Sequence, residues 1–200
     1  TWGTKFAAAL FTNLTQDHLD YHKTIDKYFE AKASLFVDYD VATRAIHCED
    51  VFGKKLFDLC QKKGLPVFSF AANGANISYS KLNCTTTGIR GPLQIDWPGL
   101  PKFELHIESP LLGAFNAQNI AGAVTIGLAL NIDANAISRA LQSAKQVPGR
   151  MERIENKKDL NIVVDYAHTP DALEKALQTL RDLKPKKVLI PIPTFSEYET

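Results

Sequence analysis

The sequence has few of the residues that build disulfide-stabilised or membrane proteins. Its 200 residues include three cysteines, one methionine and two tryptophans. The cysteines are odd in number and have no C-x-x-C spacing, which indicates reduced thiols in a cytoplasmic protein. The longest nearly uncharged apolar run, AGAVTIGLALNI, is too short to cross a bilayer and predicts a buried helix.

The sequence also lacks an excess of charge of either sign. The formal net charge is +1, and the lysines and arginines are scattered along the chain. We therefore expect neither nucleic acid nor a membrane as a partner. With 45% hydrophobic and 22% charged residues, the composition is that of a soluble globular protein. The length suits one good-sized domain, or one domain and the start of another.

Strand and helix patterns alternate along the chain and predict an α/β fold. The apolar run at 5–14 indicates a buried strand, and residues 51–70 indicate a helix closed by glycine and proline and followed by a strand. Residues 71–112 are rich in Asn, Thr, Gly and Pro with short alternating stretches, which predicts a small antiparallel excursion. Residues 115–132 and 133–145 predict two further helices, the second beginning at an aspartate.

A Pro-Gly turn in VPGRMERI (147–154) interrupts the helical pattern and predicts a domain boundary, which divides the chain into 1–147 and 148–200. Beyond it, LNIVVDYAH, TPDALEKALQTLRDL and KKVLIPI predict a strand, a helix and a strand, as in a βαβ unit. Thr169 is the expected N-cap of that helix and Pro170 its first residue.

One lysine lies on the apolar side of a predicted helix in YFEAKASLF (28–36). With ~100° per residue, Lys32 falls in the middle of the arc that holds Tyr28, Phe29 and Phe36. A lysine there either packs its stem and extends its ammonium to solvent, or it finds a partner or loses its charge. A neutral amine can react with carbon dioxide to form a carbamate, an anionic oxygen ligand. Both roles are open from the pattern.

Histidines and aspartates come just before this helix, in DHLDYH (17–22). His18 and His22 are four residues apart, as in zinc proteases, but Leu19 stands where that motif requires glutamate. We therefore reject a zinc-protease site. The remaining alternatives are a different metal site, and loop or N-cap residues that bind no ligand.

Two asparagines, Asn116 and Asn119, lie at the start of a predicted helix in FNAQN. Asparagine is a favoured helix cap, and capping accounts for one of the two. A pair of amides at the start of a helix can also contact the polar edge of a purine. The sequence therefore predicts either a cap or a nucleotide contact here.

Charged residues near the domain boundary are further candidates. Asp165 ends the run NIVVD, at the carboxyl end of a presumed parallel strand, where α/β proteins place ligand groups. The alternative is a turn residue that caps the next segment of the chain. Arg150 and Arg153 follow the Pro-Gly turn, where they are either solvated or able to hold a phosphate.

Five of these stretches, in this order, resemble the Mur ligases over about residues 5–183: FTNLTQDHLDYH, YFEAKASLF, GAFNAQNIAGA, VPGRMERI and VVDYAHTPDALEKAL. The resemblance implies that 1–147 is a central P-loop-type ATPase domain without its N-terminal part. It also implies that 148–200 begins a Rossmann-like C-terminal domain. Cyanophycin and folylpolyglutamate synthetases share this architecture. TNLTQDHLDYH is nearest to the members that add the third amino acid of the peptidoglycan stem peptide.

The resemblance implies a reaction, its substrates and its metal. Family members use ATP to phosphorylate the carboxylate of a UDP-MurNAc peptide, and the amine of a free amino acid then attacks the acyl phosphate. The implied substrates here are UDP-MurNAc-L-Ala-D-Glu and an amino acid, and we expect a monomer. By the same resemblance, Lys32 is carbamylated and holds Mg²⁺ together with His18.

The resemblance also assigns residues to the nucleotide. Asn116 and Asn119 match the adenine-side contacts, Arg150 matches the arginine near the phosphates, and Asp165 matches the carboxylate that holds the ribose. His168 lies near Asp165 in the sequence and is a secondary candidate.

Parts of the family pattern are missing. The 200 residues contain neither the Gly-rich phosphate-binding loop nor the acidic magnesium ligand that the family places upstream. They also lack the segment that recognises the incoming amino acid. We therefore expect this stretch alone to be inactive, and the rival interpretation is a non-catalytic module with the same fold. Residues 188–200 depart from the family, faintly resemble a pyridoxal-phosphate aminotransferase segment, and are left unassigned.

Overall fold

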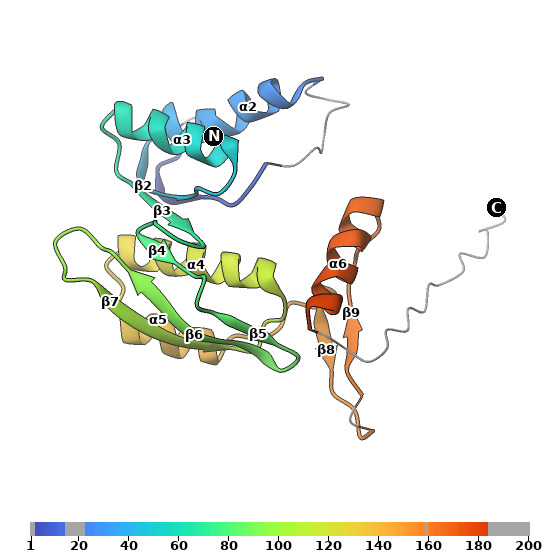
Figure 1. The fold of residues 1–200 in the computed structure, drawn as a ribbon. Helices are drawn as coiled ribbons and strands as arrows, with labels where there is room; N and C mark the ends of the chain where they lie inside the picture. Colours follow the sequence, from blue (N-terminus) through green and yellow to red (C-terminus); the bar gives the residue numbers. More distant parts are fainter. Residues whose placement is uncertain (1–2, 15–22, 159, 184–200) are drawn as a thin grey trace.

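The chain folds around a mixed sheet, parallel in its first half and antiparallel in its second. The structure is a computed structural model that describes residues 3–14, 23–158 and 160–183. In these ranges seven strands form one sheet of order β1-β2-β3-β4-β6-β5, with β7 also paired to β6 (Figure 1). Its strands are β1 (Phe6–Phe11), β2 (Val41–His47), β3 (Val67–Ala71), β4 (Ile77–Ser78), β5 (Asn83–Thr85), β6 (Gly88–Ile95) and β7 (Phe103–Ser109). The α/β prediction is confirmed.

Most of the described helices start with an N-cap residue whose side chain accepts a backbone hydrogen bond. Thr24, Asp50, Asp133 and Thr169 each accept a hydrogen bond from a backbone N–H in the first turn of the helix that follows. The predicted start at Asp133 and the predicted N-cap at Thr169, with Pro170 first in its helix, are confirmed. The helices are α2 (Ile25–Val37), α3 (Val51–Lys62), α4 (Ala114–Ala129), α5 (Ala134–Gln142) and α6 (Pro170–Asp182).

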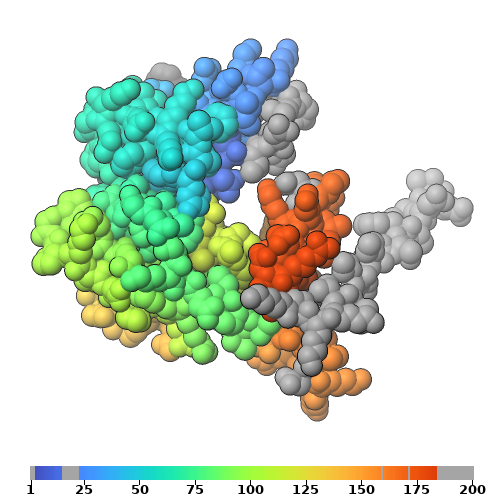
Figure 2. All heavy atoms as spheres, in the orientation of Figure 1, coloured from blue at the N-terminus to red at the C-terminus, as the bar shows by residue number. Residues whose placement is uncertain are grey.

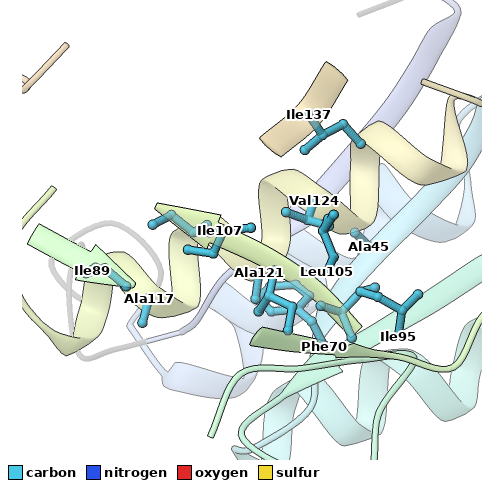
Figure 3. Packing of buried hydrophobic residues seen from close by; sticks show 13 residues of the cluster. Ala45, Phe70, Ile89, Ile95, Leu105, Ile107, Ala117, Ala121, Val124 and Ile137 are labelled. Atoms are coloured by element: carbon cyan, nitrogen blue, oxygen red, sulfur yellow. The ribbon is translucent and has the colours of Figure 1, made fainter. Parts of the chain in front are cut away.

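Helices cover both faces of the parallel half of the sheet. Neighbouring residues of β2 point to opposite faces, so Ala45 belongs to the core under α4 and Ile46 to the core under α2 and α3. Both residues are fully buried. Figure 3 shows the first of these cores, in which Phe70 lies beside Ala121 of α4 and Val124 of the same helix lies beside Leu105.

The antiparallel half confirms the predicted excursion at 71–112. β6 and β7 pair from Ile89 opposite Ser109 to Ile95 opposite Phe103. The excursion continues the main sheet, because β4 pairs parallel with β3 and antiparallel with β6. No helix in the described ranges is long and apolar enough to cross a membrane.

A smaller C-terminal unit follows the Pro-Gly turn. Here β8 (Glu152–Ile154) pairs antiparallel with β9 (Ile162–Val164), and α6 follows. Within the described residues the strand before Asp165 pairs antiparallel with β8, and its expected parallel partner is the strand after α6. The predicted strand KKVLIPI lies outside the described residues. Figure 2 shows this unit, in orange and red, beside the main body.

Candidate functional site

The first turns of α4 carry a chain of amide hydrogen bonds. Asn116 is buried, and its Nδ2 donates to the carbonyl oxygen of Leu112 at 2.8 Å. Because that carbonyl can only accept, the amide of Asn116 is oriented with Oδ1 toward Asn119, whose Nδ2 donates to it at 3.1 Å. These bonds leave Oδ1 of Asn119, an exposed residue, without a donor from the described part of the chain.

Neither asparagine caps α4, so that alternative is wrong. The N-cap is Gly113, with φ 90° and no side-chain cap hydrogen bond. A Cβ on Gly113 would lie 2.6 Å from Cγ2 of Thr179 in α6. Glycine therefore allows both the positive φ and the close approach of α6 to this end of α4.

Gln118 joins α4 to the ends of two strands, and sequence reasoning missed it. Its Nε2 donates to the carbonyl oxygen of Thr12, after β1, at 3.0 Å. The same nitrogen lies 2.9 Å from Nδ1 of His47, the last residue of β2. His47 is buried, and its ring lies 5.2 Å from the ring of Phe70. The polar run HCED at the end of a buried strand was the available signal.

A carboxylate holds the other side of this imidazole. Nε2 of His47 lies 3.1 Å from Oε2 of Glu49 and 3.0 Å from the hydroxyl of Tyr79. Tyr79 donates to the same carboxylate oxygen at 2.8 Å, and the backbone N–H of Ala72 donates to Oε1 at 2.6 Å. Burial alone would raise the pKa of Glu49, but these donors and the nearby imidazole together lower it. Burial and the adjacent Glu49 carboxylate raise the pKa of Tyr79.

Lys32 lies beside the buried face of α2, whereas the helical pattern predicted it in the middle of that face. The buried residues of this helix are Phe29, Ala33 and Phe36, and Lys32 is only half-buried. The difference arises because the buried stripe is centred between Phe29 and Ala33, about a quarter turn from Lys32. Its Nζ lies 4.7 Å from the centroid of the Tyr28 ring. No described carboxylate pairs with this amine.

The predicted metal partner, His18, lies outside the described residues. Within the described ranges, no group of three or more His, Cys, Asp or Glu side chains is placed to hold a metal ion.

Asp165 is tied to the turn between the two units. Its Oδ2 accepts from the backbone N–H of Met151 at 2.8 Å, and the N–H of Tyr166 donates to the carbonyl oxygen of Gly149 at 2.8 Å. Asp165 is exposed, and its second oxygen takes no donor from the described residues. It therefore fixes the turn at Met151, which precedes it in the chain, and not the segment that follows; its other oxygen stays available as an acceptor.

Tyr166 gathers the other candidates near the turn. The guanidinium carbon of Arg150 lies 5.8 Å from the centroid of the Tyr166 ring, and the His168 ring lies 5.0 Å from it. Nδ1 of His168 is 3.0 Å from the carbonyl oxygen of Tyr166. Arg150 and His168 are both exposed, whereas Nε of Arg153 is buried without a partner in the described structure. The structure therefore brings Arg150, Asp165 and His168 to one corner.

A cavity of about 620 Å³ opens on the α3 side of the sheet. It is lined in part by Glu49, Lys54 and Asp58. No described residue that the sequence nominated lines it, and α4 covers the opposite face of the sheet. The cavity is therefore separate from the predicted nucleotide contacts.

Two family profiles match the chain. The Mur ligase middle domain matches residues 1–127, and the Mur ligase glutamate ligase domain matches residues 149–192. This chain belongs to the Mur ligase family. The order, a middle domain and then the start of the C-terminal domain, is the order implied by the resemblance.

Named relatives and solved structures that resemble this Mur ligase chain are themselves Mur ligases. A UDP-N-acetylmuramoyl-L-alanyl-D-glutamate--2,6-diaminopimelate ligase from Thermosynechococcus vestitus is 37% identical over 191 residues, which cover 94% of this chain and 37% of the relative. A solved structure of a ligase with that name has a TM-score of 0.74 at 32% identity, covering 90% of this chain and 36% of that one. A MurF ligase from Thermotoga maritima in complex with ADP shares the fold, with a TM-score of 0.66 at 19% identity, covering 88% and 39%.

The Mur ligase chain therefore spans little more than a third of the length of these relatives. Within it, the nominated residues fall into three places. Asn116 and Asn119 share one hydrogen-bonded chain, Arg150 and the Asp165 corner lie at the turn between the units, and Lys32 lies on α2, across the sheet from α4.

Proposed function

We propose that this Mur ligase chain is part of an ATP-dependent amide ligase of the MurE type, which adds the third amino acid to UDP-MurNAc-L-Ala-D-Glu. The names of its relatives support this assignment. The structural observation that carries it is the amide chain from Leu112 through Asn116 to Asn119. That chain presents a fixed acceptor at the start of a buried helix, on the side where α6 approaches.

ATP is the proposed nucleotide. The free Oδ1 of Asn119 suits the exocyclic amino group of adenine, which is a donor. The free oxygen of Asp165 suits a ribose hydroxyl, and the exposed guanidinium of Arg150 suits the phosphates. His168 lies beside these two groups and is a secondary contact. The ADP bound by a related MurF ligase is consistent with this choice.

Mg²⁺ is the proposed metal, held by His18 and by Lys32 as a carbamate. Lys32 fits this role because the residue is half-buried and its amine has no carboxylate partner among the described residues. A carbamate would add the oxygen ligand that Mg²⁺ prefers. When bound, the ion neutralises charge that develops on the transferred phosphoryl group.

The proposed reaction has two steps. The substrate carboxylate attacks the γ-phosphorus of ATP, and ADP leaves, giving an acyl phosphate. The amine of the incoming amino acid then attacks the acyl carbon, loses a proton, and inorganic phosphate leaves as the amide forms. Asn119 and Asp165 orient the nucleotide for the first step, and Arg150 stabilises negative charge on the phosphates.

The proposal also includes the substrates, the cellular compartment and the oligomeric state. The substrates are UDP-MurNAc-dipeptide and a free amino acid, the expected compartment is the cytoplasm, and the expected state is a monomer. We further propose that the boundary between the two domains lies between residues 147 and 148, at the turn that Asp165 fixes.

Lys32→Ala in the whole protein that contains this chain tests the proposal. We expect ATP-dependent phosphate release, with UDP-MurNAc-dipeptide and an amino acid present, to fall about 100-fold or more, with partial rescue by a short carboxylate. Lys27→Ala is the matched control, because Lys27 is exposed on the same helix. Intact mass with bicarbonate should show a carbon dioxide adduct that only Lys32→Ala removes.

Full activity of Lys32→Ala would show that the proposed carbamate on Lys32 is not needed for the reaction. The rival function, a non-catalytic binding module, predicts a different result. In that case the whole protein releases no phosphate with any amino acid, while it still binds nucleotide or UDP-sugar.

A further inference from the structure

The hydrogen bonds around the buried imidazole of His47 fix which of its two ring nitrogens carries the proton. They do so because the neighbouring donor and acceptor groups cannot be reversed. The amide of Gln118 must present its nitrogen to the carbonyl oxygen of Thr12, which only accepts. The same nitrogen therefore also donates to Nδ1 of His47. Since Nδ1 accepts, the single proton of the neutral ring lies on Nε2 and points to Oε2 of Glu49.

These groups tie together the carboxyl ends of the parallel strands. Thr12 follows β1, His47 ends β2, and Glu49 accepts from the N–H of Ala72 directly after β3. Tyr79, after β4, donates to the same carboxylate. Gln118 connects this set to α4, where it lies between Asn116 and Asn119.

The first turns of α4 need such an anchor. The helix begins at Gly113 without a side-chain cap, so its start is not fixed by the usual local bond. The bonds of Gln118 to Thr12 and His47 fix it from the side of the sheet instead.

We propose that His47, as a neutral imidazole protonated on Nε2, is a positioning residue that acts through Gln118 to hold α4 and the Asn119 acceptor in place for the nucleotide. This inference rests on the proposed function. It also gives the site a pH dependence. If Nδ1 of His47 also carried a proton, two donors would face each other, and the hydrogen bond from Gln118 to Nδ1 would be lost. The titratable groups that face the ring among the described residues are Glu49 and Tyr79.

ADP binding by the whole protein tests the inference. We expect Gln118→Met, which keeps the length of the side chain and removes its donors, to weaken ADP binding about tenfold at neutral pH. The native protein should lose ADP affinity in acid, and the variant should show a flatter profile. Gln142→Met, on exposed surface of α5, is the control and should match the native protein.

Nitrogen-15 spectra of the His47 ring give a second measurement that needs no nucleotide and no variant. They should show a protonated Nε2 and an unprotonated Nδ1 at neutral pH, which tests the inference even if Gln118→Met does not fold. The opposite tautomer would overturn it. Equal ADP affinity and equal pH profiles in native protein and variant would overturn it while leaving the proposed function intact. A native protein that binds no ADP would overturn both.

Discussion

The guanidinium of Arg44 donates from Nε to the carbonyl oxygen of Phe36 at 2.5 Å. It also donates from Nη1 to the carbonyl oxygen of Val41 at 2.9 Å. Arg44 is 2% exposed, and no described carboxylate pairs with it. Phe36 lies in the last turn of α2, where helix carbonyls lack partners within the helix. Arg44 therefore fixes the end of the helix that carries Lys32.

Replacing Arg44 should destabilise the fold. Arg44→Met keeps much of the apolar stem but leaves two carbonyl oxygens without their donor, so we expect a loss of about 2–4 kcal/mol. Burial lowers the pKa of Arg44, yet arginine stays protonated, so the loss should not depend on pH near neutrality. Urea unfolding measures it. Arg90→Met is the control, because the Arg90–Glu108 pair is exposed and should contribute below about 1 kcal/mol. Equal losses would contradict the capping role.

Gly53→Ala tests a contact at the start of α3. A Cβ there would lie 1.8 Å from the carbonyl oxygen of His47, which is backbone and cannot move aside. We expect a loss of about 2–4 kcal/mol, although alanine favours helix by about 1 kcal/mol. In Gly127→Ala the new Cβ meets only the side chain of Ile137, whose Cδ1, at 2.7 Å, is a movable end. That variant should stay within about 1 kcal/mol of the native protein in urea unfolding.

The order of elements was predictable because it rests on local signals. Asp133 and Thr169 precede apolar periodicity and do begin their helices. The strand in 5–14 was recognisable as an apolar run, whereas β2, with Thr43, Arg44 and His47 in it, was not predicted as a strand. The two asparagines of FNAQN were recognisable as a pair, although the sequence could not tell a cap from a nucleotide contact.

The features that sequence reasoning missed depend on contacts between distant residues. The position of Lys32 depends on which stripe of α2 meets the sheet. The helical pattern alone placed the centre of that stripe about a quarter turn from where it lies. The His47–Gln118 contact joins residues 71 positions apart, so neither residue stands out by itself. The strand β8 was not predicted, because its three residues have no periodic pattern of their own.

The three thiols should react slowly in the native state. Burial, together with Asp58 and Asp50, raises the pKa of Cys48 to about 12, and burial raises the pKa of Cys60 and Cys84. Since the thiolate is the nucleophile, we expect no fast reaction with a disulfide reagent at about pH 8, and three reacting thiols after denaturation. Cys48→Ala should lower the second count by one. A native thiol that reacts as fast as free cysteine would contradict this prediction.

Glu49→Gln should change the response of stability to acid. Because the pKa of Glu49 is lower in the folded chain than in the unfolded one, its contribution is present above the unfolded pKa and is lost as pH falls below about 4.5. The variant lacks that carboxylate, so the free energy of unfolding should fall less steeply with acid in this range. The side chain is 42% exposed, and the difference should therefore be modest. Urea unfolding at a series of pH values measures it, with the exposed Glu155→Gln as control. If both variants follow the native curve in acid, Glu49 does not couple the His47 network to the stability of the fold.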